Sequence, residues 1–268
     1  MNNQDIKTTL INVIGETPTA YIQALRFVYI LLAKQKADPE TALLSAFLHK
    51  GDTAIDVGAN GADWTTHLHR AVGDNGAVFA FEADPYYALA TGIAVKLMGL
   101  KGVRLFPFGL SDSNEEVTLR VTDADGSRLA GLSHIEKGGV KNGRGLKTIQ
   151  LKPLDSLVRE FPALASAGVI KCDVEGYELF VFRGAVEILK QARPVVILEI
   201  GNFEEQGYTA KDVVEFFDTR DYRMYAMTAP NTLALTNAAL EHAGAISVNR
   251  IMIPKEKIDA LRTTINFL

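Results

Sequence analysis

Four carboxylates stand at or beside the carboxyl ends of four short apolar segments, a pattern that could bring them to one ligand. Parallel strands of one sheet end at the same edge, and open α/β sheets bind ligands in the crevice beyond it. Carboxylates gathered there repel one another, and no cationic side chain stands obviously near each in sequence, so ligand contacts are favoured over structural caps. The four are Asp56, Glu82, Asp173 and Glu199.

The elements that must position these carboxylates are five apolar runs separated by longer segments of helical pattern. The runs do not alternate apolar with polar residues, so both faces of each strand should be buried, as in a parallel sheet covered by helices. Right-handed crossovers then give a doubly wound, Rossmann-like α/β fold. The predicted strands are Thr53–Val57, Ala77–Glu82, Val103–Phe108, Val169–Asp173 and Val195–Ile200.

The turn after the first strand contains Gly58, Asn60 and Gly61. Gly58 allows a sharp turn and a close approach of the backbone to a ligand, and Asn60 and Gly61 tolerate a positive φ. We expect the next helix to start with Asp63 as its N-cap. Asn60 and Asp63 occupy the second and third glycine positions of a nicotinamide fingerprint, and an acid at Asp63 would repel a pyrophosphate. The turn therefore suits a cofactor with a cationic amine and no phosphate.

Glu82 follows Asp56 by 26 residues, at the end of the next strand. An acidic side chain at this position can accept hydrogen bonds from both hydroxyls of a ribose. The alternative is that Glu82 caps the following helix, but Asp84 and Pro85 already supply an N-cap and a first helical residue. Ribose binding is the favoured interpretation.

The composition is that of a globular protein, with 268 residues, 47% hydrophobic residues and a formal net charge of -4. This charge gives no sign of a nucleic-acid surface. Cys172 is the only cysteine, so no intramolecular disulfide can form, and without a secretory signal we expect a cytoplasmic protein. The apolar stretch 24–33 contains Arg26 and is too short to span a membrane.

Three regions lie outside the strand-and-helix repeat. Residues 1–50 have a helical pattern, with one helix around residues 22–32 and another from Pro39, and form an N-terminal extension packed on the core domain of residues 51–268. Residues 111–150 read as an antiparallel arm with a glycine-rich loop near the active-site edge, or as a surface excursion. At the far edge we expect a hairpin. The predicted strands are Glu116–Val121, Lys147–Leu151, Tyr222–Met227 and Ser247–Pro254, with a helix over Lys211–Asp218 and a long connection over 229–246.

Several of these motifs together resemble the FkbM-type methyltransferases, a class I S-adenosylmethionine-dependent family. The most specific block is residues 170–179, Ile-Lys-Cys-Asp-Val-Glu-Gly-Tyr-Glu-Leu, and the resemblance covers about residues 51–201. The family usually has glycine at Ala62, proline at Ala83 and an aliphatic residue at Cys172, and these departures remove no chemical group. The other motifs are 55–60 with Thr65, 81–85, 109–112, Leu154-Asp155, Gly184-Ala185, Pro194 and 198–200.

The resemblance implies that residues 51–268 bind S-adenosylmethionine and transfer its methyl group, usually to a hydroxyl oxygen. Gly58 and Asn60 would face the methionine part, and Asp56 would order that loop or contact the amine. Glu82 would bind the ribose, and Leu110 and Ser111 would lie against the adenine. The expected cofactor-binding residues are Asp56, Gly58, Ala59, Asn60, Glu82, Ala83, Leu110, Ser111 and Asp173.

Methyl transfer also requires a group that takes the proton of the acceptor hydroxyl. The candidate bases are Asp173, Glu175, Glu199 and His134. For Glu175 the alternative is that it fixes the turn after Asp173 together with Glu178, and for His134 that it is a surface residue. Asp173, Glu199 and Asn202 could instead bracket a Mg²⁺ ion, but we do not expect a metal to be required.

The sequence favours a small hydroxylated acceptor, a sugar or another natural product, over a nucleic acid. An N-methyltransferase would have the same donor site and remains an alternative. Two further alternatives are a nucleotide-binding enzyme of another class and an inactive module of the same fold. The missing glycines of the nicotinamide fingerprint disfavour the first, and the four carboxylates disfavour the second. The apolar N-terminal helices could cover the sheet or form the face of a homodimer.

Overall fold

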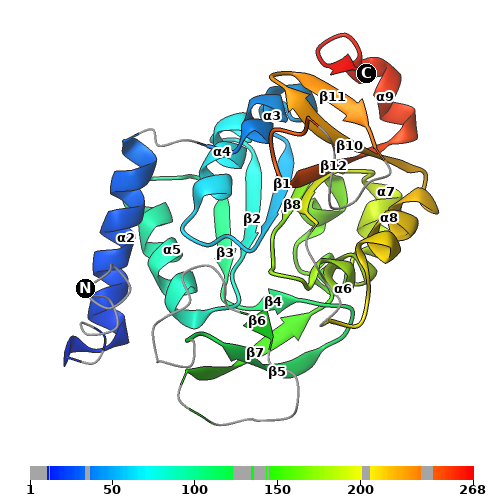
Figure 1. Cartoon of the computed structure of the whole chain (residues 1–268). Coiled ribbons are helices and arrows are strands. Elements are labelled where there is room, and N and C mark those ends of the chain that lie inside the picture. The colour runs from blue at the N-terminus through cyan, green and yellow to red at the C-terminus, as the bar shows by residue number, and fades with distance from the viewer. Residues whose placement is uncertain are drawn as a thin grey trace.

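The centre of the computed structural model is a sheet of five parallel strands in the order β3-β2-β1-β8-β9, part of a nine-stranded sheet (Figure 1). The strand order reverses at β1, so the ligand crevice of a doubly wound fold lies beyond β1 and β8. The five strands are β1 (Thr53–Val57), β2 (Ala77–Phe81), β3 (Val103–Phe106), β8 (Ala167–Cys172) and β9 (Val195–Glu199). The structure describes residues 11, 13–33, 37–122, 134–135, 143, 145–200, 206–236 and 244–268.

Burial explains why the five runs form this sheet. Every residue of β1 is buried, and β2, β8 and β9 are buried along most of their length, as continuous apolar runs predict. β3 is the edge strand of this half of the sheet and is only partly buried. The predicted doubly wound α/β class is confirmed.

The far half of the sheet is built by the last third of the chain. β12 pairs antiparallel with both β9 and β10, so a late segment is inserted between two earlier strands. The two strands expected in an edge hairpin do pair antiparallel, as β10 and β12, but they do not form the edge, because β11 and β13 lie beyond β10. The prediction of one long connection over 229–246 was wrong, because residues within it form β11 on β10. The strands are β10 (Tyr222–Ala229), β11 (Thr232–Leu235), β12 (Asn249–Pro254) and β13 (Asn266–Phe267).

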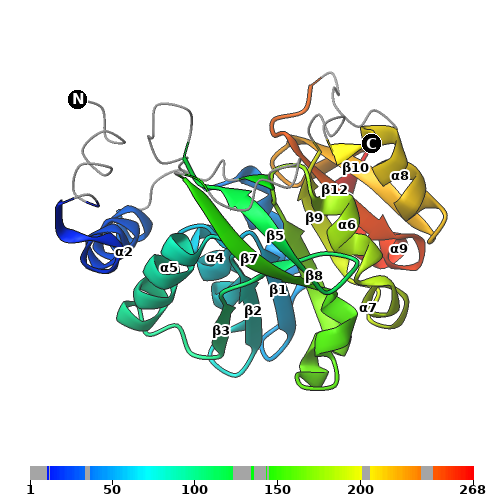
Figure 2. The same cartoon turned by 90° about the horizontal axis from the view of Figure 1, so that it is seen from below.

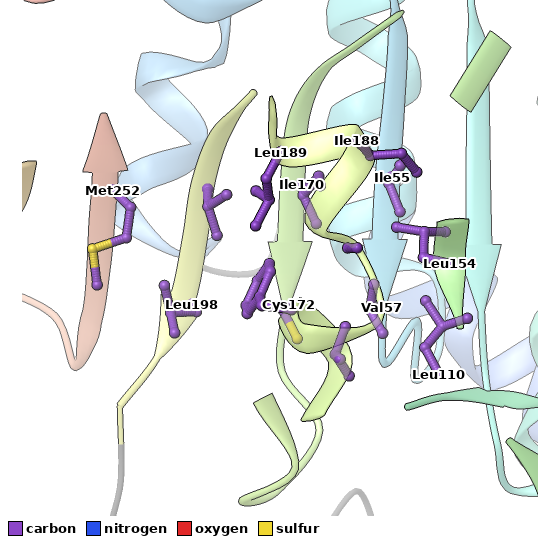
Figure 3. Close-up of a cluster of buried hydrophobic side chains, with 14 of the residues drawn as sticks. Ile55, Val57, Leu110, Leu154, Ile170, Cys172, Ile188, Leu189, Leu198 and Met252 are labelled. Carbon is purple, nitrogen blue, oxygen red and sulfur yellow. The ribbon is translucent and has the colours of Figure 1, made fainter. Parts of the chain in front are cut away.

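Helices cover both faces of the sheet and bury two apolar clusters (Figures 1 and 2). On one face lie α3 (Leu44–Phe47), α4 (Asp63–Val72) and α9 (Ile258–Leu261), with α5 (Pro85–Leu97) beside β3. On the other lie α6 (Glu178–Arg183), α7 (Val186–Gln191) and α8 (Ala210–Asp218). Figure 3 shows Ile188 and Leu189 of α7 packed over Ile55 and Ile170, and here Cys172 acts as a small buried apolar residue.

The N-terminal region differs from the prediction in one element. α2 (Glu16–Leu32) is a helix that packs along α5 at the outer edge of the molecule (Figure 2). The helix predicted from Pro39 is instead a 3₁₀ turn, η1 (Pro39–Leu43), followed by the single turn α3, because the backbone becomes extended at Leu48 on its way to β1. Further 3₁₀ turns in the described ranges are η2 (Leu154–Leu157), η3 (Pro162–Ser166) and η5 (Lys255–Lys257).

A second, four-stranded sheet lies across the carboxyl ends of the central strands (Figure 1). Its order is β4-β7-β5-β6, and β5 and β7 form the antiparallel arm that the sequence predicts between residues 111 and 150. One face carries a small apolar cluster that includes Leu119, Ile149 and Leu151. The strands are β4 (Gly109–Leu110), β5 (Glu115–Arg120), β6 (His134–Ile135) and β7 (Leu146–Lys152).

Candidate active site

The turn after β1 is shaped by glycines and one alanine with positive φ. Gly58 has φ 86°, and a Cβ at this residue would lie 1.8 Å from the carbonyl oxygen of Asp173. Gly58 is therefore required for close approach to the neighbouring strand end as well as for its backbone angle. Gly61 has φ 85°, as allowed for, whereas Asn60 does not have a positive φ.

The helix after this turn does not begin as expected. Asp63 is the first residue of α4, and the N-cap is Ala62, which adopts φ 67°. The prediction of Asp63 as the N-cap was therefore wrong. An alanine therefore stands in the left-handed region here, and such a conformation costs an L-residue about 1–2 kcal/mol.

Asp56 lies beneath the turn and is buried. Its carboxylate accepts a hydrogen bond from the Thr65 hydroxyl of α4, and it does not line the cleft. Burial raises the pKa of Asp56 to about 6, against the opposing effects of Thr65 and Lys171. This position supports the role of ordering the turn, one of the two that the sequence left open.

Glu82 faces the cleft from the end of β2, with both carboxylate oxygens held by the backbone. It accepts hydrogen bonds from Asn60 N at 2.9 Å and from Asp84 N at 2.8 Å. Asp84 itself accepts from Tyr86 N and caps α5, with Pro85 as the first helical residue, as expected. Burial raises the pKa of Glu82 to about 7 despite the two backbone donors. Each oxygen retains a lone pair for a ligand hydroxyl.

The cleft between the central sheet and the second sheet contains about 870 Å³ of empty space, a volume that includes open solvent. Its charged lining residues are all acidic in the described part of the chain, which suits a cation and disfavours phosphates. Apolar side chains from the second sheet form the wall of the cleft next to Leu110. The lining residues that the argument uses are Gly58, Asn60, Glu82, Ala83, Leu110, Leu119, Ile135, Ile149, Leu151, Asp173, Glu175 and Tyr177.

Several predicted cofactor residues lie behind this lining. Ala59 is buried, and its backbone N–H donates to the Phe81 carbonyl. Ser111 is fully buried next to Leu110, with its hydroxyl 3.1 Å from a carboxylate oxygen of Glu115. The sequence did not indicate a cleft position for Tyr177 or for the second-sheet residues Leu119, Ile135, Ile149 and Leu151. The period-two apolar pattern of Val117, Leu119 and Val121 was the available signal for the latter.

The loop after β8 is held by Glu178. One oxygen of Glu178 accepts hydrogen bonds from Val174 N at 3.0 Å and Gly176 N at 3.4 Å. Tyr208 secures the same loop, because its hydroxyl donates to the Gly176 carbonyl at 2.9 Å. Burial raises the pKa of Glu178 to about 7. Glu178 thus fixes the turn after Asp173. This is the structural role that the sequence offered as the alternative for Glu175 and Glu178.

Glu175 has a different position from Glu178. It lines the cleft, is an exposed residue and has φ 53°. Its side chain makes no hydrogen bond within the part of the chain that the structure describes. Partial burial first, and then the charges of Asp173 and Glu199, raise its pKa to about 7. Burial also raises the pKa of Glu199, which does not line the cleft. A carboxylate near neutrality in a strained turn is a candidate functional group.

A buried cation lies beneath these carboxylates. Lys171 of β8 is directly opposite Asp56 of β1, and its ammonium group lies 3.5 Å from a carboxylate oxygen of Asp173. It donates to Asn249 Oδ1 at 3.1 Å, and Asn249 Nδ2 donates to the buried Glu40 at 3.2 Å. No cationic partner for each carboxylate was obvious from the sequence, and the structure provides Lys171 as a partner of Asp173. Residues two apart on a strand share a face, so Lys171 and Asp173 were the available signal.

The side chains of two further predicted residues lie outside the described part of the structure. The backbone of His134 pairs with Arg120 in the second sheet, but its side chain lies outside the described part of the structure, as does the whole of Asn202. Among the described residues no group of three His, Cys, Asp or Glu side chains could hold a metal ion. No helix in the described ranges has the length and apolar character needed to cross a membrane.

Comparisons with known proteins agree with this geometry. The family model of the methyltransferase FkbM domain matches residues 56–224, more than half of the chain. The chain therefore belongs to the FkbM methyltransferase family, and the resemblance inferred from its motifs is confirmed. Its cofactor is S-adenosylmethionine, whose sulfonium and amine fit an acidic cleft with a ribose-binding carboxylate. Comparison with curated proteins gave no match.

Solved structures provide distant likenesses. Methyltransferase FkbM from Methylobacillus flagellatus KT is 13% identical, with a TM-score of 0.48 and coverage of 94% of this chain and 62% of that one, so this chain spans less than two thirds of it. A SAM-dependent O-methyltransferase from Thermotoga maritima is 14% identical, with a TM-score of 0.40 and coverage of 84% and 69%. A rRNA methylase from Streptococcus thermophilus is 13% identical, with a TM-score of 0.42 and coverage of 80% and 91%. These likenesses do not decide the methyl acceptor.

Proposed function

We propose that the chain transfers the methyl group of S-adenosylmethionine to a hydroxyl oxygen of a small, uncharged acceptor, with Glu175 as the base. The observation that carries this proposal is that Glu175 lines the same cleft as Glu82 with a pKa of about 7. A base is most effective when its pKa lies near the working pH.

The donor half of the cleft would hold the cofactor through residues at the ends of β1, β2 and β4. Glu82 accepts the two ribose hydroxyls, Gly58 and Asn60 lie along the methionine part, and Leu110 lies against the adenine. Asp56 acts from below by holding Thr65 and thereby α4. When bound, the cofactor supplies an electrophilic methyl group on a positively charged sulfur.

The acceptor half would position and deprotonate the hydroxyl. Glu175 would accept the hydroxyl proton as the oxygen–methyl bond forms and the sulfur–methyl bond breaks, so the proton moves to the carboxylate and S-adenosylhomocysteine is the leaving group. Asp173 lies beside it, fixed by Lys171, and Glu199 is a further acidic group on the neighbouring strand. Such a cluster of acids repels a polyanion, which favours a neutral sugar or natural product over a nucleic acid. His134 remains a proposed acceptor-site residue.

Matched acceptors test this function. The protein is incubated with methyl-labelled S-adenosylmethionine and pairs of hydroxylated compounds and their amino analogues, and the position of the label is determined by NMR. Label on oxygen in the hydroxylated member, absent with Glu82→Ala, is expected. Label on nitrogen only would replace the proposal with an N-methyltransferase, and binding of the cofactor without transfer to any class of acceptor would contradict it.

A further inference from the structure

Helix α2 packs on the rest of the chain through small residues and Phe27, whereas five of its large apolar side chains are exposed. The face toward α5 carries Thr19, Ala20 and Ala24, which are buried, and the Tyr86 hydroxyl donates to the Thr19 carbonyl at 3.2 Å. The opposite face carries what we call the α2 stripe. Its members are Tyr21 (55% exposed), Ile22 (49%), Leu25 (60%), Tyr29 (69%) and Leu32 (67%).

The α2 stripe is one continuous face. With 3.6 residues per turn, its five side chains fall within an arc of about 100°, on the side opposite Ala20 and Ala24. α2 lies at the outer edge of the molecule with α5 behind it, so the stripe points away from the domain (Figures 1 and 2). A helix that is apolar on both faces is normally buried on both.

The size and charge of the α2 stripe fit an interface with another protein molecule better than a membrane surface. At about 200 Å² for a large side chain, the stripe offers roughly 600 Å² of apolar surface, close to the roughly 800 Å² that each partner buries in a standard interface. Between Glu16 and Leu32 the only basic residue is Arg26. A membrane-surface helix instead carries several basic residues along its polar face.

We propose that the α2 stripe is a homodimer interface, in which α2 packs antiparallel against α2 of a second copy around a twofold axis near Leu25. Leu25 lies near the middle of the helix, with Tyr21 one turn before it and Tyr29 one turn after it. An antiparallel twofold pairing therefore places each Tyr21 beside Tyr29 of the other copy. Residues four apart form the ridge that packs into an identical groove, and twofold interfaces require such self-complementarity.

The proposed interface adjoins the donor site without forming part of it. Phe27 of α2 lies against Gly61, where an added Cβ would be 2.8 Å from the Phe27 ring, and Phe27 stacks on Tyr87 at 6.3 Å between ring centroids. Lys147 of the second sheet binds Glu16 at 3.0 Å. Dimerisation through α2 would thus support the cofactor turn from outside, whichever acceptor the protein uses.

Molecular mass in solution is the first test. We expect the full chain to sediment as a dimer at micromolar concentration, and Leu25→Glu to raise the dissociation constant by about 30-fold or more, as for a central interface residue. The matched control is Leu235→Glu, which changes a leucine of similar exposure (55%) on β11 and should leave the dimer intact. A monomeric wild type, or a dimer that Leu25→Glu does not weaken, would overturn the proposal. Binding of the monomer to anionic vesicles that Leu25→Glu abolishes would also overturn it.

Disulfide trapping tests the antiparallel geometry and does not depend on a destabilising charge. The natural cysteine, Cys172, is buried, so only an introduced thiol should react. On an antiparallel twofold, Leu25→Cys lies next to its own copy and should form a covalent dimer under mild oxidation. Leu32→Cys lies about 21 Å from its own copy along the axis and should not. Equal trapping at both positions, or at neither, would overturn the antiparallel pairing.

Discussion

The two halves of the cleft hold their carboxylates in opposite ways. In the donor half, Glu82 accepts two backbone N–H groups and Asp56 accepts the Thr65 hydroxyl. In the acceptor half, Glu175 has no hydrogen-bond partner within the described residues, and partial burial and then the charges of Asp173 and Glu199 raise its pKa. Both Glu82 and Glu175 have a pKa of about 7, but the first is fixed and the second is not.

This difference separates binding from proton transfer. A carboxylate held by backbone donors keeps its position and its acceptor lone pairs, which suits the recognition of a ribose. A carboxylate left among like charges gains by taking up a proton, which suits a base. Variants in the two halves should therefore affect different measured quantities, and the following predictions run from the largest expected effect to the smallest.

Glu175→Gln should break the acceptor half alone. Removing the base is expected to lower kcat by about 1000-fold, within the usual range for general-base catalysis. The dissociation constant for S-adenosylmethionine should change by less than about threefold, because cofactor recognition rests on the other half. Steady-state kinetics and calorimetric titration provide the two values. Glu187→Gln, an exposed glutamate on α7, is the control, and an unchanged kcat in Glu175→Gln would remove Glu175 from the mechanism.

Glu82→Ala should break the donor half alone. The loss of two hydrogen bonds to a charged acceptor is expected to weaken S-adenosylmethionine binding by about 100-fold or more. The measurement is calorimetric titration of wild type and variant, with the exposed Glu116→Ala as control. If the affinity stays within a few-fold of wild type, Glu82 does not bind the ribose.

Lys171→Met should weaken both halves, because Lys171 faces Asp56 on one side and Asp173 on the other. Removing a buried cation from its partners is expected to lower the free energy of unfolding by about 2–3 kcal/mol. Urea denaturation measures this change, with Lys152→Met, which removes a less buried lysine from β7, for comparison. A variant as stable as wild type would show that Lys171 does not stabilise the site.

Cofactor affinity should depend on pH through Glu82. Its pKa in the free protein is about 7, so the carboxylate that accepts the ribose hydroxyls is present above pH 7 and lost below it. Binding of 5′-methylthioadenosine, which lacks the titrating amine, should weaken by about tenfold from pH 8 to pH 6. The same titration with Glu82→Gln should be flat, and an equal slope in both proteins would assign the effect elsewhere.

Ala62→Gly should have the smallest effect. Glycine removes about 1–2 kcal/mol of left-handed strain, but it loses a buried methyl worth about 0.8 kcal/mol and adds freedom to the unfolded chain. The net change in the free energy of unfolding should therefore be below about 1 kcal/mol. Thermal denaturation tests this balance, and a loss above 2 kcal/mol would mean that the Ala62 methyl has a packing role greater than its size suggests.

The central sheet and the cleft-facing positions of Glu82 and Glu175 could be anticipated because both follow from local patterns. Continuous apolar runs specify strands buried on two faces, and their carboxyl ends specify the position of the crevice. β1 coincides with its predicted bounds, and the others differ by one or two residues. The ten consecutive residues around Asp173 were the most specific of the motifs that indicated the family.

Other features depend on contacts between distant parts of the chain. Glu178 and Glu175 look equivalent in sequence, but only Glu178 is reached by the backbone of its own loop. The wall that the second sheet contributes to the cleft depends on how that sheet packs across the central strands. The 3₁₀ form of η1 depends on the extended backbone that follows it. The Lys171–Asn249–Glu40 contacts join residues as much as 209 positions apart, which no local pattern can reveal.

The insertion of β12 has a consequence for the order of assembly during synthesis. Asn249 can reach Lys171 only after β12 has entered between β9 and β10, both of which leave the ribosome earlier. Until then the Lys171 ammonium lacks its amide partner and the β9 edge is open to wrong pairing. A nascent chain that ends before residue 249 therefore contains every residue named in the S-adenosylmethionine cleft but lacks β12, the strand whose Asn249 supports Lys171. Cofactor binding should consequently begin only when the final strands have been added.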